Sequence, residues 1–276
     1  MTTMNERTAD RAARATTIVA AATLLCTSIA TTASASSFTT QASTRGAHVA
    51  VVQLQLVLDT SASVPARYRL QALAAIAELV TGWPHPLPAI GGSPAQSGLL
   101  IQVRDVSADS YAPESLLGTW SVPSIPAVRG LPSDVTADFT QRVITYKREH
   151  AAAAAAYSRA VSDARRAALG LRGLRPKTTY ASEIEGAVSA AAQSFSPSGV
   201  RRLVVVSDLA QNRPPQIAGD LRGVGVLLAH LCLKVSTCQN QERTWSRTLR
   251  ARGAASVVFV RIERFATALA EFVGQP

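Results

Sequence analysis

Three oxygen-bearing side chains follow the most apolar run of the sequence at alternate positions. The run from Val49 to Leu58 contains only two polar residues, and Asp59, Ser61 and Ser63 come directly after it. A run this apolar is typical of a central strand that is buried on both faces. A carboxylate and two hydroxyls at alternate positions of the following turn can face one point. Oxygen ligands of this kind suit a hard cation such as magnesium.

Further polar side chains are expected beside this group. In an open parallel sheet, ligands gather at the carboxyl ends of the strands. Asp208 follows the predicted strand over 202–207, and a helix is predicted over 183–195. The alternative to a metal site is that the acids cap turns and the serines cap helices, since Asp and Ser commonly do both.

The order of these elements resembles the von Willebrand factor A family, whose metal-ion-dependent adhesion site opens with Asp-x-Ser-x-Ser after the first strand. The resemblance implies a site for Mg²⁺ or Mn²⁺ in which hydroxyls coordinate the ion directly and carboxylates bind it directly or through water. A carboxylate from a partner would complete the shell. The implied ligands are Asp59, Ser61, Ser63, Ser182 and Asp208, with Thr179 as the alternative to Ser182.

The resemblance spans residues 48 to 275 and departs from the family at two positions. Ser182 stands where the family usually has Thr, although a Ser hydroxyl offers the same lone pairs. Leu209 stands where the family often has Gly, directly after the acid. These departures keep open a second possibility, a metal-free A-domain-like scaffold that binds through its surface loops.

Strands and helices alternate along most of the chain. Such alternation implies right-handed crossovers and a parallel sheet covered on both faces. The fold class predicted is therefore α/β, a Rossmann-like three-layer sandwich with a mostly parallel central sheet. Beyond the elements above, strands are expected at 99–106, 225–233 and 256–261, an edge strand near 120–122, and helices at 68–80, 241–252 and 264–273.

Residues 133–169 contain no Gly or Pro and include six consecutive alanines. Ser133 is a suitable N-cap, so one long helix or a pair of helices is expected there. Relative to the simplest family members this stretch is a helical insertion. It either packs along the domain or projects towards a partner.

The first 35 residues resemble a secretory signal peptide. Three Arg residues precede an apolar run, and the small residues Ala33, Ser34 and Ala35 follow it. An uncleaved N-terminal membrane anchor is the alternative. Residues 36–47 are polar and small, as expected of a flexible linker. The domain is therefore expected to be secreted or extracytoplasmic, and no later stretch is apolar enough to span a membrane. The composition, rich in Ala and Arg, looks bacterial.

The formal net charge is +10, and removal of residues 1–35 lowers it to +9. A basic surface favours anionic partners, so a protein or an anionic cell-envelope component is expected. Scattered Arg residues, few aromatics and no recognition motif argue against nucleic acid. Cys232 and Cys238 are close enough in sequence to form a disulfide in an oxidising compartment; the alternative is a buried thiol and a free one.

The sequence lacks residues that several classes of enzyme require. A haloacid dehalogenase-like phosphatase would need a second acid two residues after the first, and Ser61 cannot replace it. The chain has no Gly-x-Ser-x-Gly elbow, and neither a Gly-x-Gly-x-x-Gly turn nor a phosphate-binding loop. His230 lies within an apolar strand and is interpreted as a core residue. The expectation is a binding domain and not an enzyme.

Overall fold

The computed structural model describes residues 51–88, 91–106, 109–133, 137–180, 183–210, 215–231 and 235–274. The predicted signal peptide over 1–35 and linker over 36–47 lie outside the described residues, as do Ser182 and Cys232. Contacts divide the chain into two units, Met1–Gly46 and Ala47–Pro276. Every described residue belongs to the second unit.

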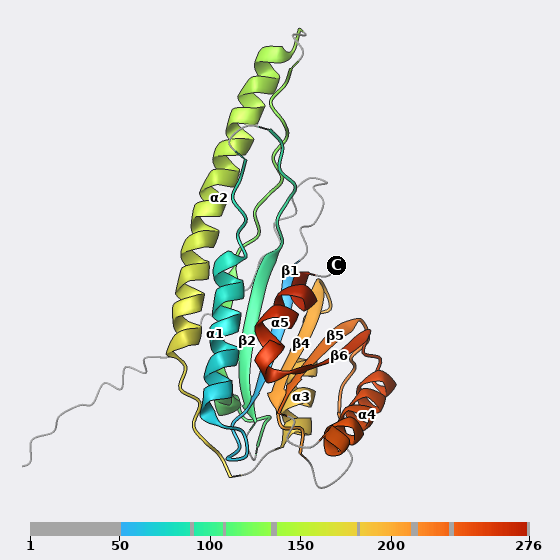
Figure 1. Ribbon diagram of the computed structural model, residues 1–276. Coiled ribbons are helices and arrows are strands. Elements are labelled where there is room, and N and C mark those ends of the chain that lie inside the picture. The colour runs from blue at the N-terminus through green and yellow to red at the C-terminus, as the bar shows by residue number, and fades with distance from the viewer. Residues whose placement is uncertain are drawn as a thin grey trace, which may run out of the picture. The chain divides into compact units, whose positions relative to one another are not determined.

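The described strands form one sheet in the order β3-β2-β1-β4-β5-β6, and Figure 1 labels five of them, β2, β1, β4, β5 and β6. Only β3 runs antiparallel to its neighbour, β2, and the other adjacent pairs are parallel. The mostly parallel sheet predicted from the sequence is therefore confirmed. The strands are β1 (Val51–Asp59), β2 (Gly98–Val106), β3 (Leu116–Val122), β4 (Val200–Ser207), β5 (Val224–His230) and β6 (Ser256–Arg261).

Helices cover both faces of this sheet. Leu54, Leu56 and Leu58 of β1 point into a core shared with α1, α2 and α5. Val57 points into a second core shared with α3 and α4. The three-layer arrangement follows from β1 being buried on both faces, with Gln53 and Gln55 buried on the same face as Val57. The helices are α1 (Ala66–Gly82), α2 (Phe139–Gly173), α3 (Ile184–Gln193), α4 (Val235–Ala251) and α5 (Phe265–Gly274), with short 3₁₀ turns η1 (Pro113–Ser115) and η2 (Ile262–Arg264).

Several predicted boundaries differ from the structure. The helix expected over 133–169 is a single described helix, Phe139–Gly173, with Asp138 and not Ser133 at its N-cap position. The edge strand expected near 120–122 is longer, Leu116–Val122. Helix α4 begins at Val235 and not at Gln241, because buried Cys238 gives its polar first turns a packing contact that the sequence pattern did not reveal. Strand β5 ends at His230 and not at 233. Directly after the strand, the Leu231 N–H donates to the Ser207 carbonyl at 3.3 Å.

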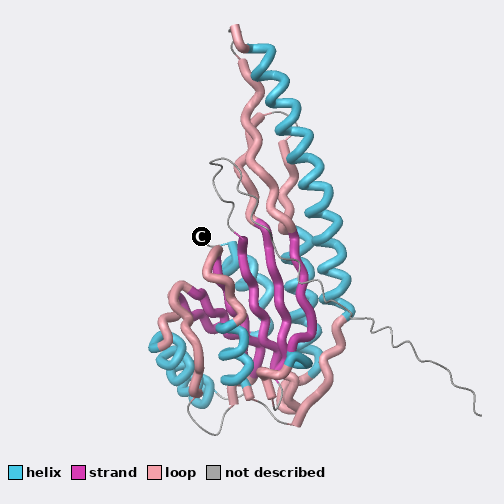
Figure 2. The backbone as a smooth tube through the Cα atoms, turned by 180° about the vertical axis from the view of Figure 1, so that it is seen from behind, coloured by secondary structure: helices cyan, strands magenta, loops and turns pink. Residues whose placement is uncertain are grey.

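The two halves of α2 have different surroundings. Its second half packs along α1 through a stripe of small residues, which lets the two helix backbones approach closely. None of residues 139–152 is buried. Figures 1 and 2 show this first half continuing past the ends of the strands, beside loop segments. The stripe consists of Ala153, Ala156, Ala160, Ala164, Ala167 and Ala168, and buried Leu171 follows it.

We call residues 91–97, 123–133 and 137–152 the arm. Its loop segments pair with each other through isolated antiparallel bridges, Ser93 with Val128 and Gln96 with Ile125. A 35-residue helix is about 50 Å long. Because the chain after α2 returns to the end of β1, the arm lies at the opposite end of the sheet from Asp59. The insertion thus both packs on the domain and projects from it.

Two glycines form the slot that holds Trp120 of β3. A β-carbon at Gly118 or at Gly170 would overlap the indole ring, whereas a β-carbon at Gly173 would meet nothing within 4 Å. Gly170 lies inside α2, where glycine costs about 1 kcal/mol relative to alanine. The close approach of the indole explains why glycine is present at this position.

We expect Gly170→Ala to destabilise the protein by about 1–3 kcal/mol, because overlap with Trp120 outweighs the gain in helix propensity. Gly173→Ala is the matched control in the same helix and should be neutral or slightly stabilising. Urea unfolding of both variants measures the difference. Equal midpoints for the two variants would contradict this account of the Trp120 slot.

Candidate metal centre

The carboxyl ends of four neighbouring strands carry a row of polar side chains. Asp59 ends β1, and Ser207 ends β4 beside it. Ser207 pairs in register with His230 of β5, which pairs with Arg261 of β6. Residues that pair in a parallel sheet point to the same face, here the face covered by α3 and α4. The row therefore closes the end of the second core.

The Asp59 carboxylate is fully buried and held on both oxygens. Its Oδ2 accepts a hydrogen bond from the Ser207 hydroxyl at 2.6 Å, and its Oδ1 accepts one from the Ser61 N–H at 2.9 Å. Hydrogen bonds to a charged acceptor contribute about 1.5–3 kcal/mol each. Ser207 was not among the predicted ligands, although its place between an apolar strand and Asp208 could have indicated it.

The two serines of the predicted motif are in contact. The Ser61 and Ser63 hydroxyl oxygens lie 2.8 Å apart. Ser61 is buried, whereas Ser63 is exposed to solvent. The structure therefore brings Asp59, Ser61 and Ser63 together, with one edge of the group open to solvent.

Thr179 lies against this turn, but its hydroxyl faces another neighbour. The Thr179 N–H donates to the Thr60 carbonyl at 2.8 Å, and the Ala62 N–H donates to the Thr179 carbonyl at 3.1 Å. The Thr179 hydroxyl lies 3.2 Å from that of Thr60 and donates to the Val106 carbonyl at 3.3 Å. Backbone hydrogen bonds thus hold Thr179, in the segment after α2, beside the turn that follows Asp59. Ser182, the predicted ligand, lies outside the described residues.

Asp208 is half-buried and forms a local turn. Its Oδ1 accepts a hydrogen bond from the Ala210 N–H at 2.9 Å. Among the described residues, no hydrogen bond joins its carboxylate to Ser61 or Ser63. Leu209 has φ of +55°, the left-handed region that glycine favours, and its side chain is buried. The backbone strain of such a residue is about 1–2 kcal/mol, and burial of the Leu209 side chain offsets it.

A buried arginine adjoins the same turn and was missed from the sequence. Arg69 of α1 is 3% exposed, and its Nη2 donates to the Thr178 hydroxyl at 3.1 Å. Burial lowers the pKa of Arg69, and the charge of Asp59 acts in the opposite direction. A helical pattern that places Arg69 next to apolar positions was the available signal, since Leu73 and Ile76 are buried on the same face.

His230 is a buried residue, as predicted, with an acidic partner that was not predicted. Its Nε2 lies 2.9 Å from a carboxylate oxygen of Glu242 on α4. Its Nδ1 is buried without a hydrogen-bond partner among the described residues. Burial lowers the pKa of His230; Glu242 and Glu263 raise it and Arg261 lowers it, all with smaller effects. The neutral imidazole is therefore favoured in the folded protein.

The predicted cysteine pair is described only in part. Cys238 is disulfide-bonded and buried in α4. Its predicted partner, Cys232, lies outside the described residues. Within the described part of the chain, none of the helices has the length and apolar character of a membrane span.

The donors at the end of β1 fit a hard cation. All of them are oxygens, from one buried carboxylate and two adjacent hydroxyls, which are the ligands that Mg²⁺ and Mn²⁺ prefer. Among the described residues no cluster of three or more His, Cys, Asp or Glu occurs. The candidate site therefore depends on hydroxyl ligands, as the family motif implies.

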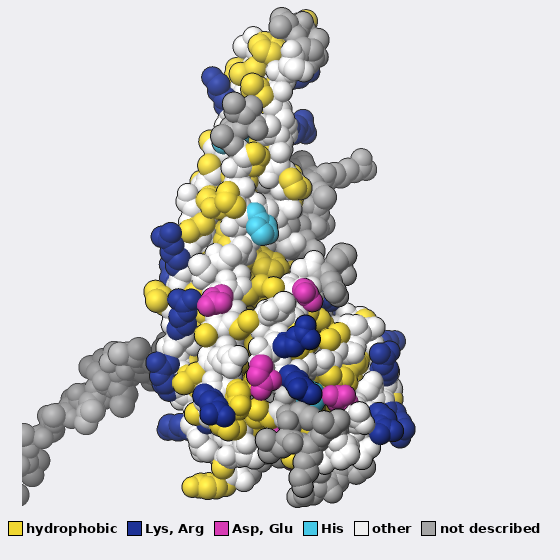
Figure 3. All heavy atoms as spheres, viewed as in Figure 1, with side chains coloured by type: hydrophobic (Ala, Val, Ile, Leu, Met, Phe, Trp, Pro, Cys, Tyr) yellow, Lys and Arg dark blue, Asp and Glu magenta, His cyan; other side chains and the backbone are white. Residues whose placement is uncertain are grey.

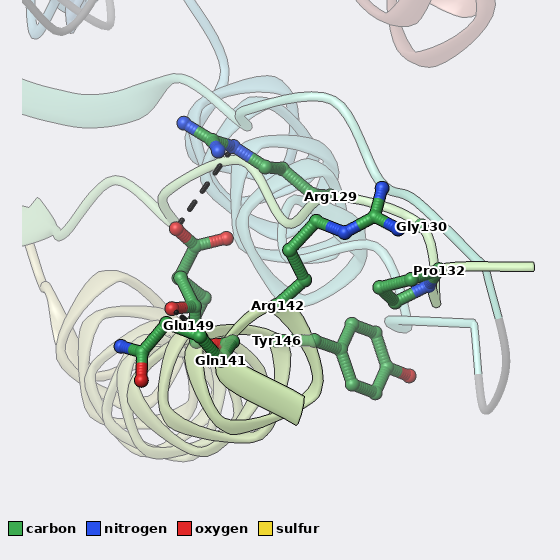
Figure 4. A pocket seen from close by; sticks show the side chains of 8 residues that line it. Arg129, Gly130, Pro132, Gln141, Arg142, Tyr146 and Glu149 are labelled. Carbon is green, nitrogen blue, oxygen red and sulfur yellow. Dashed lines mark hydrogen bonds and ion pairs between the residues drawn. The ribbon is translucent and has the colours of Figure 1, made fainter. Parts of the chain in front are cut away.

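Another hollow lies on the arm. It has a volume of about 340 Å³ and is lined by residues of α2 and of the loop before it, as Figure 4 shows. Arg129 lies 4.0 Å from Glu149, and Arg142 lies 3.3 Å from Asp138. These charged groups are paired within the arm. The hollow therefore has fewer polar groups available to a ligand than the ends of the strands have.

No protein-family model and no curated protein matches the sequence. Solved structures of von Willebrand factor A-domain proteins are similar to it in fold. Two are structures of proximal thread matrix protein 1 from the mussel byssus, one of them with a zinc-occupied MIDAS motif. Each has 10% identity and a TM-score of 0.42, and the match covers 82% of this chain and 48% of that one.

Manganese-loaded TRAP protein of Plasmodium vivax is a further neighbour, with 8% identity, a TM-score of 0.34 and coverage of 81% and 74% of the two chains. The match to the mussel protein covers 48% of that protein, so the present chain spans about half of its length. The likeness is one of fold at low TM-scores. No residue role, metal or partner is carried over from these structures.

A pH effect on stability follows from His230. Since its folded pKa is lowered, the unfolded chain binds more protons between that value and about pH 6.5. The stability contributed by neutral His230 is complete above about pH 6.5 and falls as the pH drops towards the folded pKa. We expect the wild type to lose more unfolding free energy from pH 7.5 to 5.5 than His230→Gln. His85→Gln, at an exposed histidine, is the control; parallel curves for all three proteins would refute the effect.

Proposed function

We propose that the domain is an exported, non-catalytic binding module that holds Mg²⁺ or Mn²⁺ at the end of β1. The observation that carries the proposal is the buried Asp59 carboxylate, fixed by Ser207 and by the Ser61 N–H beside two touching serine hydroxyls. A buried carboxylate is costly unless hydrogen bonds or positive charge compensate it. A cation bound by Ser61 and Ser63 would supply that charge.

The candidate ligands would each contribute differently to binding of the ion. Ser61 and Ser63 supply hydroxyl ligands, and Asp59 supplies negative charge directly or through water. Asp208 and Ser182 are proposed to complete the shell, with Thr179 as the alternative to Ser182. The bound ion supplies a positive centre that can accept a carboxylate oxygen from a partner. Exposed Ser63 places that centre where a partner can reach it.

The partner is proposed to be a protein or an anionic component of the cell envelope. The chain carries a formal net charge of +10, and Figure 3 shows Lys and Arg side chains spread over one face without a single dense patch. A dispersed positive field favours anionic surfaces in general. It gives no support for nucleic acid, which is usually bound by clustered basic side chains.

A metal-free binding scaffold is the second candidate. It is favoured by the Asp208 carboxylate, which forms a local turn with Ala210, and by buried Arg69 as a source of positive charge near Asp59. Phosphatase chemistry has less support, because the Ser61 hydroxyl contacts Ser63 and cannot replace an acid. Metal binding separates the two binding candidates directly.

Calorimetric titration of the purified protein with MnCl₂ or MgCl₂ tests the proposal. We expect saturable binding that Asp59→Asn weakens by tenfold or more, because the substitution removes the buried charge and keeps the side-chain shape. Asp163→Asn is the control, since Asp163 pairs with Arg166 on α2. Circular dichroism establishes that each variant is folded. Wild-type binding that persists unchanged in Asp59→Asn would contradict the proposed site.

A further inference from the structure

Arg69 is a buried cation that the proposed metal site does not use. It lies in the second turn of α1 and is 3% exposed. Its Nη2 donates to the Thr178 hydroxyl at 3.1 Å, and its Nη1 is buried without a hydrogen-bond partner among the described residues. Arginine remains charged inside proteins, so the positive charge is permanent.

The residue that Arg69 contacts belongs to the loop beside the metal site. Thr178 precedes Thr179, whose backbone is hydrogen-bonded to Thr60 and Ala62. Arg69 therefore lies against the segment that flanks the Asp59 turn. Asp59 is the acid whose charge acts on Arg69 among the described residues. Because its Nη1 lacks a hydrogen bond among the described residues, part of the guanidinium charge stays unpaired next to the segment that flanks the Asp59 turn.

Two cations that interact with one buried carboxylate repel each other. Arg69 offsets the charge of Asp59 before any metal arrives, and this lowers the attraction that a divalent ion would feel. An exposed arginine at a similar position would have little effect, because water screens it. Arg67 provides that comparison: it lies two residues away in the same helix and is exposed.

We propose that Arg69 is the internal counter-cation of the strand-end site, which keeps Asp59 compensated without metal and weakens metal binding in the free protein. The proposal rests on the proposed function, since it concerns the affinity of that same site. A site compensated in this way stays folded when empty. The site binds the metal more tightly when a partner adds its own negative charge, because that charge offsets the repulsion between Arg69 and the metal.

The test is calorimetric titration with MnCl₂ of the wild type, Arg69→Met and Arg67→Gln. Methionine has a similar length without the charge. We expect Arg69→Met to bind Mn²⁺ about tenfold or more tightly than the wild type, and Arg67→Gln to bind within about twofold of it. Arg69→Gln repeats the charge removal should the methionine variant not fold.

Each outcome bears on a different claim. Equal affinity in the wild type and both Arg69 variants would overturn the role of Arg69 and leave the metal site standing. Absence of Mn²⁺ binding in every variant would overturn the proposed metal site, and the Arg69 inference with it. Tighter binding in Arg67→Gln as well as in Arg69→Met would also overturn the inference, because the effect would then come from net charge.

A metal-free readout provides a second test. In chelator, Asp59→Asn should destabilise the wild type more than it destabilises Arg69→Met, because the first case leaves a buried guanidinium without its counter-charge. Urea unfolding of the two single variants and the double variant measures this coupling. Additive effects of the two substitutions would show that Asp59 and Arg69 do not compensate each other.

Discussion

A carboxylate buried at the end of the central strand must be compensated, and the surroundings of Asp59 are arranged to do so. The Ser207 hydroxyl and the Ser61 N–H hold its two oxygens, and Arg69 provides a permanent positive charge nearby. Without such partners a buried charge would cost several kcal/mol. In our proposal, compensation by these hydrogen bonds and by Arg69 keeps the site folded when empty, and the touching hydroxyls of Ser61 and Ser63 suit it to a cation.

The sheet order explains why these residues meet. Strand β1 is central, so its end lies between β2 and β4, and register pairing places Ser207 beside Asp59 and His230 beside Ser207. The segment after α2 then fastens onto residues 60–62. The long helix thereby connects two ends of the domain: its last turns lead to the site, and its first turns belong to the arm at the far end of the sheet.

Much of the fold could be predicted from the sequence, because apolar β1 and the alternation of strands and helices depend on local pattern. The grouping of Asp59, Ser61 and Ser63 could be predicted because it depends on spacing within one turn. Arg69 was missed although it shares a helix face with Leu73 and Ile76, because a charged residue at such a position is usually assigned to solvent. The partner of His230 depends on packing of α4 against β5, residues that are adjacent only after folding.

Binding of a divalent cation at Ser61 and Ser63 beside Asp59 can be observed in crystals grown with excess Mn²⁺ and measured at a wavelength where manganese scatters anomalously. We expect an anomalous peak about 2.0–2.3 Å from both serine hydroxyl oxygens, and a lower peak in crystals of Asp59→Asn grown at the same Mn²⁺ concentration. A well-ordered turn at 59–63 with no peak, or a peak confined to another part of the surface, would contradict the claim.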